Sequence, residues 1–197
     1  MSKSSFKSNL VIAETGVISA LIIAMTFVPY IGYISYGGLS ITLIHIPVII
    51  GACLLGIKGG ITFGAVWGIS CMLKALFAPP TPLEGILFKN PVVSVIPRIL
   101  SGLAAAAIFI LLKNHSKIKY ILSVIIGCAV NTVFVMGSIY LLYGNKYGTE
   151  LGISSINLGG LTNYVLAAFG INAVIEIAVA IIITIPTVKA IDKKVKK

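Results

Sequence analysis

The chain has 197 residues, of which 58% are hydrophobic and only 10% are charged. A composition this apolar excludes an ordinary soluble domain, because the continuous apolar runs exceed the ~18 residues that cross a bilayer as a helix. The runs do not alternate apolar with polar residues, which excludes a transmembrane β-barrel. The net charge of +10 does not indicate nucleic-acid binding, because the lysines lie at the ends of the apolar runs and act as topology signals.

We predict an all-α membrane protein with six transmembrane helices, over residues 10–30, 41–57, 59–78, 91–112, 120–143 and 163–188. The segment GIKGG joins the second and third spans, and we expect a tight turn there with Gly59 and Gly60 as the helix breakers. No linker or sequence repeat divides the chain, so we expect one domain over residues 1–197. We expect no cleavable signal peptide, because the first apolar run is too long and no cleavage site follows it.

Lysines are distributed unequally between the two ends of the predicted spans. Only Lys89 and Lys146 lie on one side. Eleven lie on the other side: Lys3, Lys7, Lys58, Lys113, Lys117, Lys119, Lys189, Lys193, Lys194, Lys196 and Lys197. Because lysines concentrate on the cytoplasmic side of membrane proteins, we expect both termini in the cytoplasm.

The three connecting segments on the predicted outer side are long and rich in Gly, Pro, Asn and Tyr: GYISYGGLS, PPTPLEGILFKN and GNKYGTELGISSINLGGLT. Apolar residues interrupt them, among them Ile34, Leu39, Ile86, Leu87, Phe88 and Ile156. Elaborate loops on one face usually carry function, so we expect these segments to cover a binding site. Disordered connectors are the alternative.

Polar side chains inside the predicted spans are candidates for that site, because each must find a partner in the membrane. Arg98 is the only arginine in the chain and lies seven residues after Pro91. At about 1.5 Å per residue, it is roughly 10 Å below the outer end of the fourth span. Further candidates approach the same end from other spans: Lys74, His45, Asn131, Asn172, Trp67, Tyr140 and Tyr164. If they face inward together, they line a site that opens to the outside.

Each candidate also has a structural interpretation. Lys74 can extend to the headgroups, and the tyrosines can form an interfacial belt. His45 and Asn131 can serve helix packing. Arg98 can form an internal salt bridge, for example with Glu176, although a guanidinium also suits an anionic ligand, because it binds a carboxylate in a bidentate manner.

We expect no enzymatic activity. The segment GISC at residues 68–71 resembles the start of a rhomboid-type serine nucleophile, but neither His45 nor His115 lies at a matching depth. The three cysteines lack metal-ligand spacing, so we expect them in the core, without a metal, cofactor or disulfide. No nucleotide-binding loop is present, so ATP-driven transport would need partner proteins. A binding protein, an ATP-independent carrier or channel, and an assembly subunit remain.

Ala20 and Ala24 in the first span form a pair of small residues, which lets two helices approach closely in lipid. With the six spans, the outer loops and the block ITLIHIPVIIGACLLGIKGGITFGAVWGISCMLKALFAPPTP, the pair resembles the substrate-binding S components of energy-coupling factor (ECF) vitamin transporters. The resemblance covers nearly the whole chain. It is strongest where glycines recur at Gly51, Gly56, Gly60, Gly64 and Gly68.

This resemblance implies a vitamin-binding subunit of a prokaryotic plasma membrane, which docks through Ala20 and Ala24 onto a membrane coupling protein with two ABC ATPases. It also implies that the subunit topples to carry its closed site to the cytoplasm. The segments MLKALFAPPTP and NPVVSVIPRILSG look most like the pantothenate-type group, and pantothenate is a small carboxylate that suits Arg98. An S component for folate, riboflavin or a similar vitamin is the alternative, although LIHIPV replaces the riboflavin-type pattern.

Overall fold

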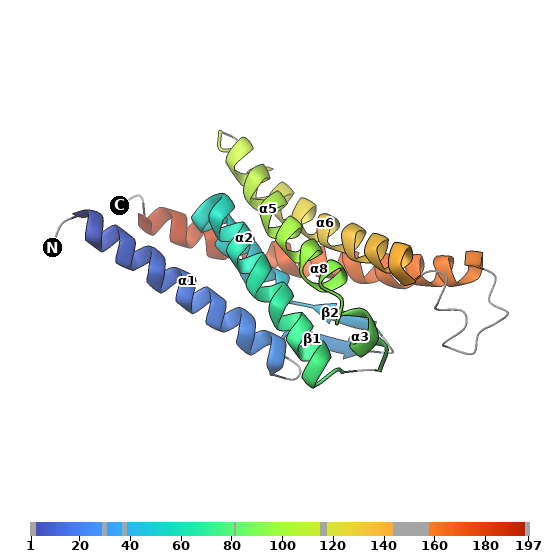
Figure 1. Ribbon diagram of the computed structural model, residues 1–197. Coiled ribbons are helices and arrows are strands. Elements are labelled where there is room, and N and C mark those ends of the chain that lie inside the picture. Colours follow the sequence, from blue (N-terminus) through green and yellow to red (C-terminus); the bar gives the residue numbers. More distant parts are fainter. Residues whose placement is uncertain are drawn as a thin grey trace.

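A computed structural model describes residues 3–28, 31–36, 39–80, 82–114, 118–143 and 158–195 (Figure 1). The helices are α1 (Lys3–Phe27), α2 (His45–Phe77), α3 (Pro82–Leu87), α4 (Pro91–Ser94), α5 (Ile96–Leu111), α6 (Ile118–Tyr143) and α8 (Leu158–Val195). Two short strands, β1 (Tyr33–Tyr36) and β2 (Leu39–Thr42), pair as an antiparallel hairpin between α1 and α2. The described part of the chain is therefore almost entirely helical, as predicted.

α2 is a helical hairpin rather than a straight rod. Gly56 leaves the helical conformation with φ 65° and ψ −151°, which glycine adopts without a steric penalty because it has no Cβ. The chain reverses there: a Cβ on Gly51 would collide with the ring of Phe63. In a straight helix those two residues would be about 18 Å apart. Within the described part of the chain, the two arms of α2 bring the longer helical segments to six, which agrees with the predicted number.

Two details of the predicted second and third spans are wrong. Gly59 and Gly60 do not break the helix; both are buried in the second arm of α2, and the break is at Gly56. The second predicted span does not begin at residue 41, because residues 39–42 form β2 and the helix starts at His45. The first arm therefore rises only about 16 Å, roughly half of a ~30 Å hydrocarbon core.

Other predicted boundaries shift in smaller ways. The fourth span is divided at Val95 into α4 and α5, and α8 is longer than the predicted 163–188. Asn90 begins α4 by accepting a hydrogen bond from the Val92 N–H (2.9 Å). The first two outer segments contain the β-hairpin and α3, whereas residues 144–157 of the third lie outside the described residues.

A row of glycines brings the second arm of α2 against α5. Gly60, Gly64 and Gly68 recur every four residues, so they share one helix face. A Cβ on Gly60 would overlap the backbone of Gly102, and one on Gly64 would overlap the Arg98 carbonyl group. The glycines therefore fix the backbone position of Arg98 relative to α2.

We expect Gly64→Ala to destabilise the protein by about 1–3 kcal/mol, because only a backbone movement can relieve the overlap of the new methyl group with Arg98. Gly137→Ala on α6 is the matched control. Apart from its own helix, no atom of the described residues lies within 4 Å of a Cβ built there. Alanine favours a helix over glycine by about 0.8–1.0 kcal/mol, so this control should be neutral or stabilising. Equal losses in thermal unfolding would contradict the packing argument.

Two apolar clusters hold the bundle together. One joins the first arm of α2 to α5, α6 and α8, and includes Ile49, Ala105 and Val124. The other joins α1 to both arms of α2 and includes Ile22 and Trp67. The fully buried polar and aromatic residues are thus held by rigid helices rather than by loops.

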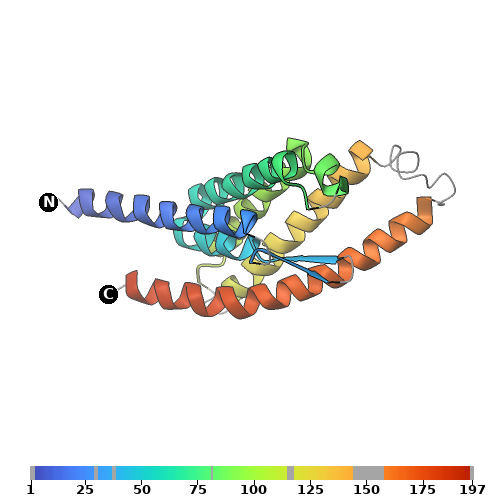
Figure 2. The same cartoon turned by 90° about the horizontal axis from the view of Figure 1, so that it is seen from below.

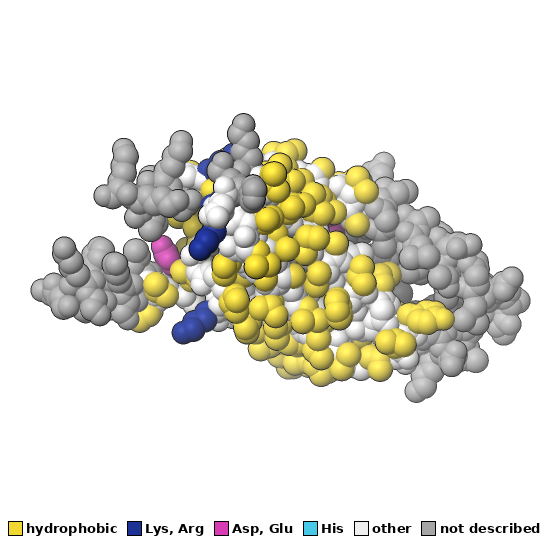
Figure 3. All heavy atoms as spheres, turned by 90° about the horizontal axis from the view of Figure 1, so that it is seen from above, with side chains coloured by type: hydrophobic (Ala, Val, Ile, Leu, Met, Phe, Trp, Pro, Cys, Tyr) yellow, Lys and Arg dark blue, Asp and Glu magenta, His cyan; other side chains and the backbone are white. Residues whose placement is uncertain are grey.

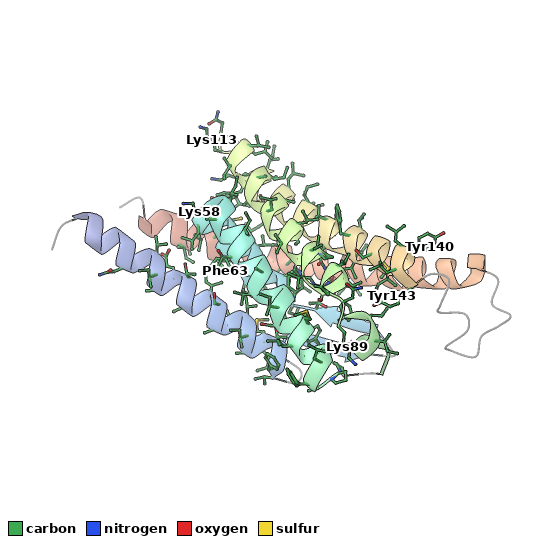
Figure 4. The ribbon with its side chains drawn as sticks, viewed as in Figure 1. Lys58, Phe63, Lys89, Lys113, Tyr140 and Tyr143 are labelled. Carbon is green, nitrogen blue, oxygen red and sulfur yellow. The ribbon has the colours of Figure 1, made fainter. Side chains whose placement is uncertain are left out.

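The two ends of the bundle differ in character. Both termini lie at one end (Figure 2), and Lys58 and Lys113 lie at that end too, whereas Lys89, Tyr140 and Tyr143 lie at the opposite end (Figure 4). We call these the terminal end and the distal end. Their lysines have the sidedness that the sequence predicts, with the distal end as the expected outer side.

The surface between the two ends suits a bilayer. Among the described residues, four helical segments have the length and apolar composition of a membrane span: His45–Phe77, Pro91–Leu111, Ile118–Tyr143 and Ala173–Ile191. In His45–Phe77 this length is divided between the two arms of α2. The apolar part of α1, Val11–Phe27, is shorter. Figure 3 shows hydrophobic side chains spread over the middle of one face, with the visible lysines near the terminal end.

Candidate binding site

A packing layer in the middle of the bundle gives a common level from which the positions of the polar residues along their helices can be compared. The Ser101 hydroxyl on α5 donates a hydrogen bond to the carbonyl oxygen of Gly127 on α6 (2.8 Å). A Cβ on Gly127 would also lie 3.3 Å from Cδ1 of Ile49 in the first arm of α2. The three helices therefore meet at this level. About one helical turn nearer the distal end lie three predicted site residues: His45, Arg98 and Asn131.

Arg98 is buried, with 7% of its surface exposed. Its Nη1 donates a hydrogen bond to the Val93 carbonyl oxygen (2.5 Å). Its guanidinium carbon lies 5.3 Å from the ring centroid of Trp67 and 5.0 Å from that of Phe88. Its Nε is buried and has no hydrogen-bond partner among the described residues. Native proteins leave few buried donors unpaired, so this N–H is available for a ligand.

Three other candidate residues also carry buried polar atoms without hydrogen-bond partners in the described part of the chain: His45 Nε2, Trp67 Nε1 and Asn131 Oδ1. An indole N–H donates, an amide oxygen accepts, and an imidazole nitrogen does either. Trp67 contacts the Arg98 guanidinium, whereas His45 and Asn131 are placed only at a similar height along the bundle. Together with the guanidinium, groups of these kinds suit an anion that also carries hydroxyl or amide groups. Thr184 Oγ1 on α8 also lacks a partner among the described residues, but it lies nearer the terminal end.

Lys74 makes a structural contact that the sequence did not predict. Its Nζ donates a hydrogen bond to the carbonyl oxygen of Thr26 in the last turn of α1 (2.8 Å) and lies 4.4 Å from the ring centroid of Tyr33. The Tyr33 hydroxyl in turn lies 3.2 Å from Cys71 Sγ, in the second arm of α2. A cation at a helix C-terminus complements the helix dipole. Lys74 therefore fastens α1 and β1 to the second arm of α2.

We expect Lys74→Met to lower the free energy of unfolding by about 1 kcal/mol, because it removes a charged hydrogen bond at a partly exposed position. Ligand affinity should change less than about threefold, well under the ~1.4 kcal/mol of a tenfold change. Lys89→Met, at an exposed lysine of the same end, is the matched control. Thermal unfolding and ligand titration on each variant would separate the two roles. A large loss of affinity with unchanged stability would make Lys74 a ligand contact.

Glu176 on α8 anchors the β-hairpin. Its Oε1 accepts a hydrogen bond from the Thr42 backbone N–H (2.6 Å). Thr42 is the last residue of β2 and lies three residues before His45. The sequence suggested Glu176 only as a partner for Arg98, and it gave no signal for this contact, because the hairpin itself was not predicted.

The remaining candidates have mixed outcomes. Tyr140 is 60% exposed at the distal end of α6, so it is not one of the residues with buried polar atoms. Tyr164 and Asn172 lie on α8, but their side chains are outside the described residues. Phe88 was noted only as an apolar loop residue, yet it contacts Arg98. The three cysteines, at residues 53, 71 and 128, are buried in the core, as predicted.

The predicted docking pair lies on the outside of the bundle. Ala20 and Ala24 are exposed on α1, whereas Ile22 and Thr26 are fully buried. Residues two apart point to opposite sides of a helix, so the alanines face away from the core. They present a surface of small side chains along the outer face of α1.

The sequence matches the family described as "ECF transporter, substrate-specific component" over residues 12–188. The chain belongs to this family. It is therefore a membrane-embedded transporter subunit, an S component, and not an enzyme. Membership also implies association with the other subunits of an ECF transporter. The resemblance seen in the sequence is thus confirmed.

Two relatives of this S component have names that state a substrate. It is 32% identical to the "Pantothenic acid transporter PanT" of Lactococcus lactis subsp. cremoris, over 77% of this chain and 78% of the relative. It is 30% identical to the "Pantothenate transporter PanT" of Leuconostoc mesenteroides subsp. mesenteroides, over 83% of each chain.

Proposed function

We propose that this S component captures pantothenate near the distal end of the bundle, with its carboxylate against Arg98. The observation that carries the proposal is the buried guanidinium between Trp67 and Phe88, whose Nε has no partner among the described residues. The names of the two relatives support the same vitamin.

Other buried polar groups of the described residues match the rest of this ligand. Pantothenate carries one carboxylate, two hydroxyls and an amide. Asn131 Oδ1 can accept from a hydroxyl, and the Trp67 indole N–H can donate to a carbonyl or hydroxyl oxygen. A ligand that pairs these buried atoms removes the cost of leaving them unpaired, about 1–3 kcal/mol each.

Delivery of the vitamin requires partners. In this proposal, the loaded subunit docks through Ala20 and Ala24 onto the membrane coupling protein of the ECF transporter, and two ABC ATPases drive its toppling toward the cytoplasm. The exposed position of both alanines supports this role for α1.

Intrinsic fluorescence tests the vitamin assignment at the site itself. Trp67 is the only tryptophan in the chain, and its ring lies 5.3 Å from the Arg98 guanidinium. Titration of the purified protein with pantothenate should change its emission and saturate at one ligand per chain. Calorimetry with folate and riboflavin should detect no binding. Binding of either vitamin in place of pantothenate would refute the assignment, and uptake into liposomes without partners or ATP would favour a carrier.

A further inference from the structure

The terminal end of the bundle holds two lysines against one pair of aromatic rings. Lys119 in the first turn of α6 is only 8% exposed, and its Nζ lies 4.5 Å from the ring centroid of Phe109 and 4.9 Å from that of Tyr120. Lys189 on α8 places its Nζ 5.4 Å from the same Tyr120 centroid. The two rings pack edge to face. We call these four residues the basic cluster.

This arrangement concentrates positive charge where an anion would stabilise it. Burial disfavours a charged ammonium, and two ammonium groups around one ring repel each other. A cation–π contact attracts each lysine to the ring but does not neutralise it. A phosphate group that both ammonium groups reach would satisfy both, and it would do so across two different helices.

The surroundings indicate a lipid rather than a soluble ion. Large apolar side chains are exposed at the adjoining ends of α5 and α6: Ile110, Leu111, Ile118 and Ile121. Leu111, the last residue of α5, is 75% exposed. A free phosphate gains nothing from such a surface, whereas a phospholipid places its phosphate at the helix ends and its acyl chains along the helices. Basic sites between transmembrane helices bind anionic headgroups in this way.

We propose that the basic cluster binds the phosphate of an anionic phospholipid in the leaflet at the terminal end of the protein. This site is separate from the one around Arg98, which lies toward the distal end. Its occupation would hold α5, α6 and α8 together at the end of the bundle where their aromatic and basic residues meet.

The test compares the full-length protein in nanodiscs of pure phosphatidylcholine and in nanodiscs that also contain phosphatidylglycerol. Phosphatidylglycerol should raise the unfolding temperature of the wild type. The double variant Lys119→Met, Lys189→Met should lose that rise, and native mass spectrometry should show at least a ~10-fold loss of retained phosphatidylglycerol, because both charge-assisted contacts are removed. Lys58→Met is the matched control, since Lys58 is exposed at the same end (Figure 4). An equal loss in Lys58→Met, or no effect of phosphatidylglycerol on the wild type, would overturn the proposal.

A further arm separates a lipid from a soluble anion. Inorganic phosphate added to phosphatidylcholine nanodiscs should not stabilise the protein. Stabilisation equal to that by phosphatidylglycerol would assign the cluster to a soluble anion instead.

A single variant keeps the test valid if the double variant does not fold. Lys189 is only partly buried, so Lys189→Gln should fold, as size-exclusion chromatography and circular dichroism would check. Its phosphatidylglycerol retention should fall by at least about threefold, since one of the two cations is lost. Unchanged retention in this folded variant would also overturn the proposal.

Discussion

Arg98→Ala should weaken binding of pantothenate by at least ~10- to 100-fold, because a charge-assisted hydrogen-bonded pair is worth roughly 1.5–3 kcal/mol and each ~1.4 kcal/mol is a factor of ten. Loss of the guanidinium also leaves the ligand carboxylate desolvated and unpaired, which adds to the effect. The substitution removes the hydrogen bond to Val93 and the contacts with Trp67 and Phe88 as well, so stability must be measured in parallel.

Two companion variants separate charge from packing. Arg98→Met keeps most of the side-chain volume between the rings, so a loss of affinity comparable to that of Arg98→Ala would be due to the charge. Arg98→Lys should recover only part of the affinity, because an ammonium lacks the planar fork that holds both carboxylate oxygens.

A ligand analogue gives the decisive control. The carboxamide analogue of pantothenate should bind the wild type poorly, whereas Arg98→Ala should bind the acid and the amide about equally. If the acid keeps its full advantage in Arg98→Ala, then Arg98 is structural and another cation, with Lys74 as the next candidate, binds the carboxylate.

The number of helices could be predicted from the sequence, because the thickness of the bilayer fixes the length of an apolar span. The position of the turn in α2 could not. Gly56, Gly59 and Gly60 are equivalent as potential breakers, and their roles depend on the partner helix. Gly60 is needed against the backbone of Gly102, which lies far along the chain. Gly56 is the glycine that adopts the positive φ of the turn.

Relative depth along the helices was less predictable. The predicted spans put His45 near the outer end and Asn131 near the midplane, whereas the contacts around Gly127 put both at a height similar to that of Arg98. Depth does not determine which way a side chain points around its helix. Lys74 and Tyr140 therefore lie at the distal end, as predicted, but they do not belong to the residues with buried, unpaired polar atoms.

Residues between helices were the least predictable. Phe88 lies between α3 and α4, and its contact with Arg98 depends on the path of both short helices. The β-hairpin at residues 33–42 includes residues expected in the second span. Its end is fixed by Glu176, which lies more than a hundred residues later in the sequence. The sequence around a residue does not indicate which distant residues it will contact.

Replacement of Ala20 or Ala24 by leucine should abolish vitamin uptake by cells that contain the complete transporter. Both alanines are exposed on α1, on the side opposite the fully buried Ile22 and Thr26, so larger side chains there enter no internal space. A partner helix that packs closely on small residues would be displaced by them. We therefore expect uptake at least ~10-fold below wild type, a loss of ~1.4 kcal/mol or more in association, and failure to co-purify with the coupling protein.

Ligand binding by the isolated subunit distinguishes a docking defect from misfolding. The Trp67 titration should be unchanged within about twofold, which is under ~0.5 kcal/mol. Ala178→Leu on α8 is the matched control, because Ala178 is also exposed on an apolar helix and receives the same substitution. Ala178→Leu should assemble and transport normally, since α8 presents no pair of small residues at this position for a close helix contact. Loss of ligand binding in Ala20→Leu with intact assembly would show that this face of α1 supports the site rather than the partner.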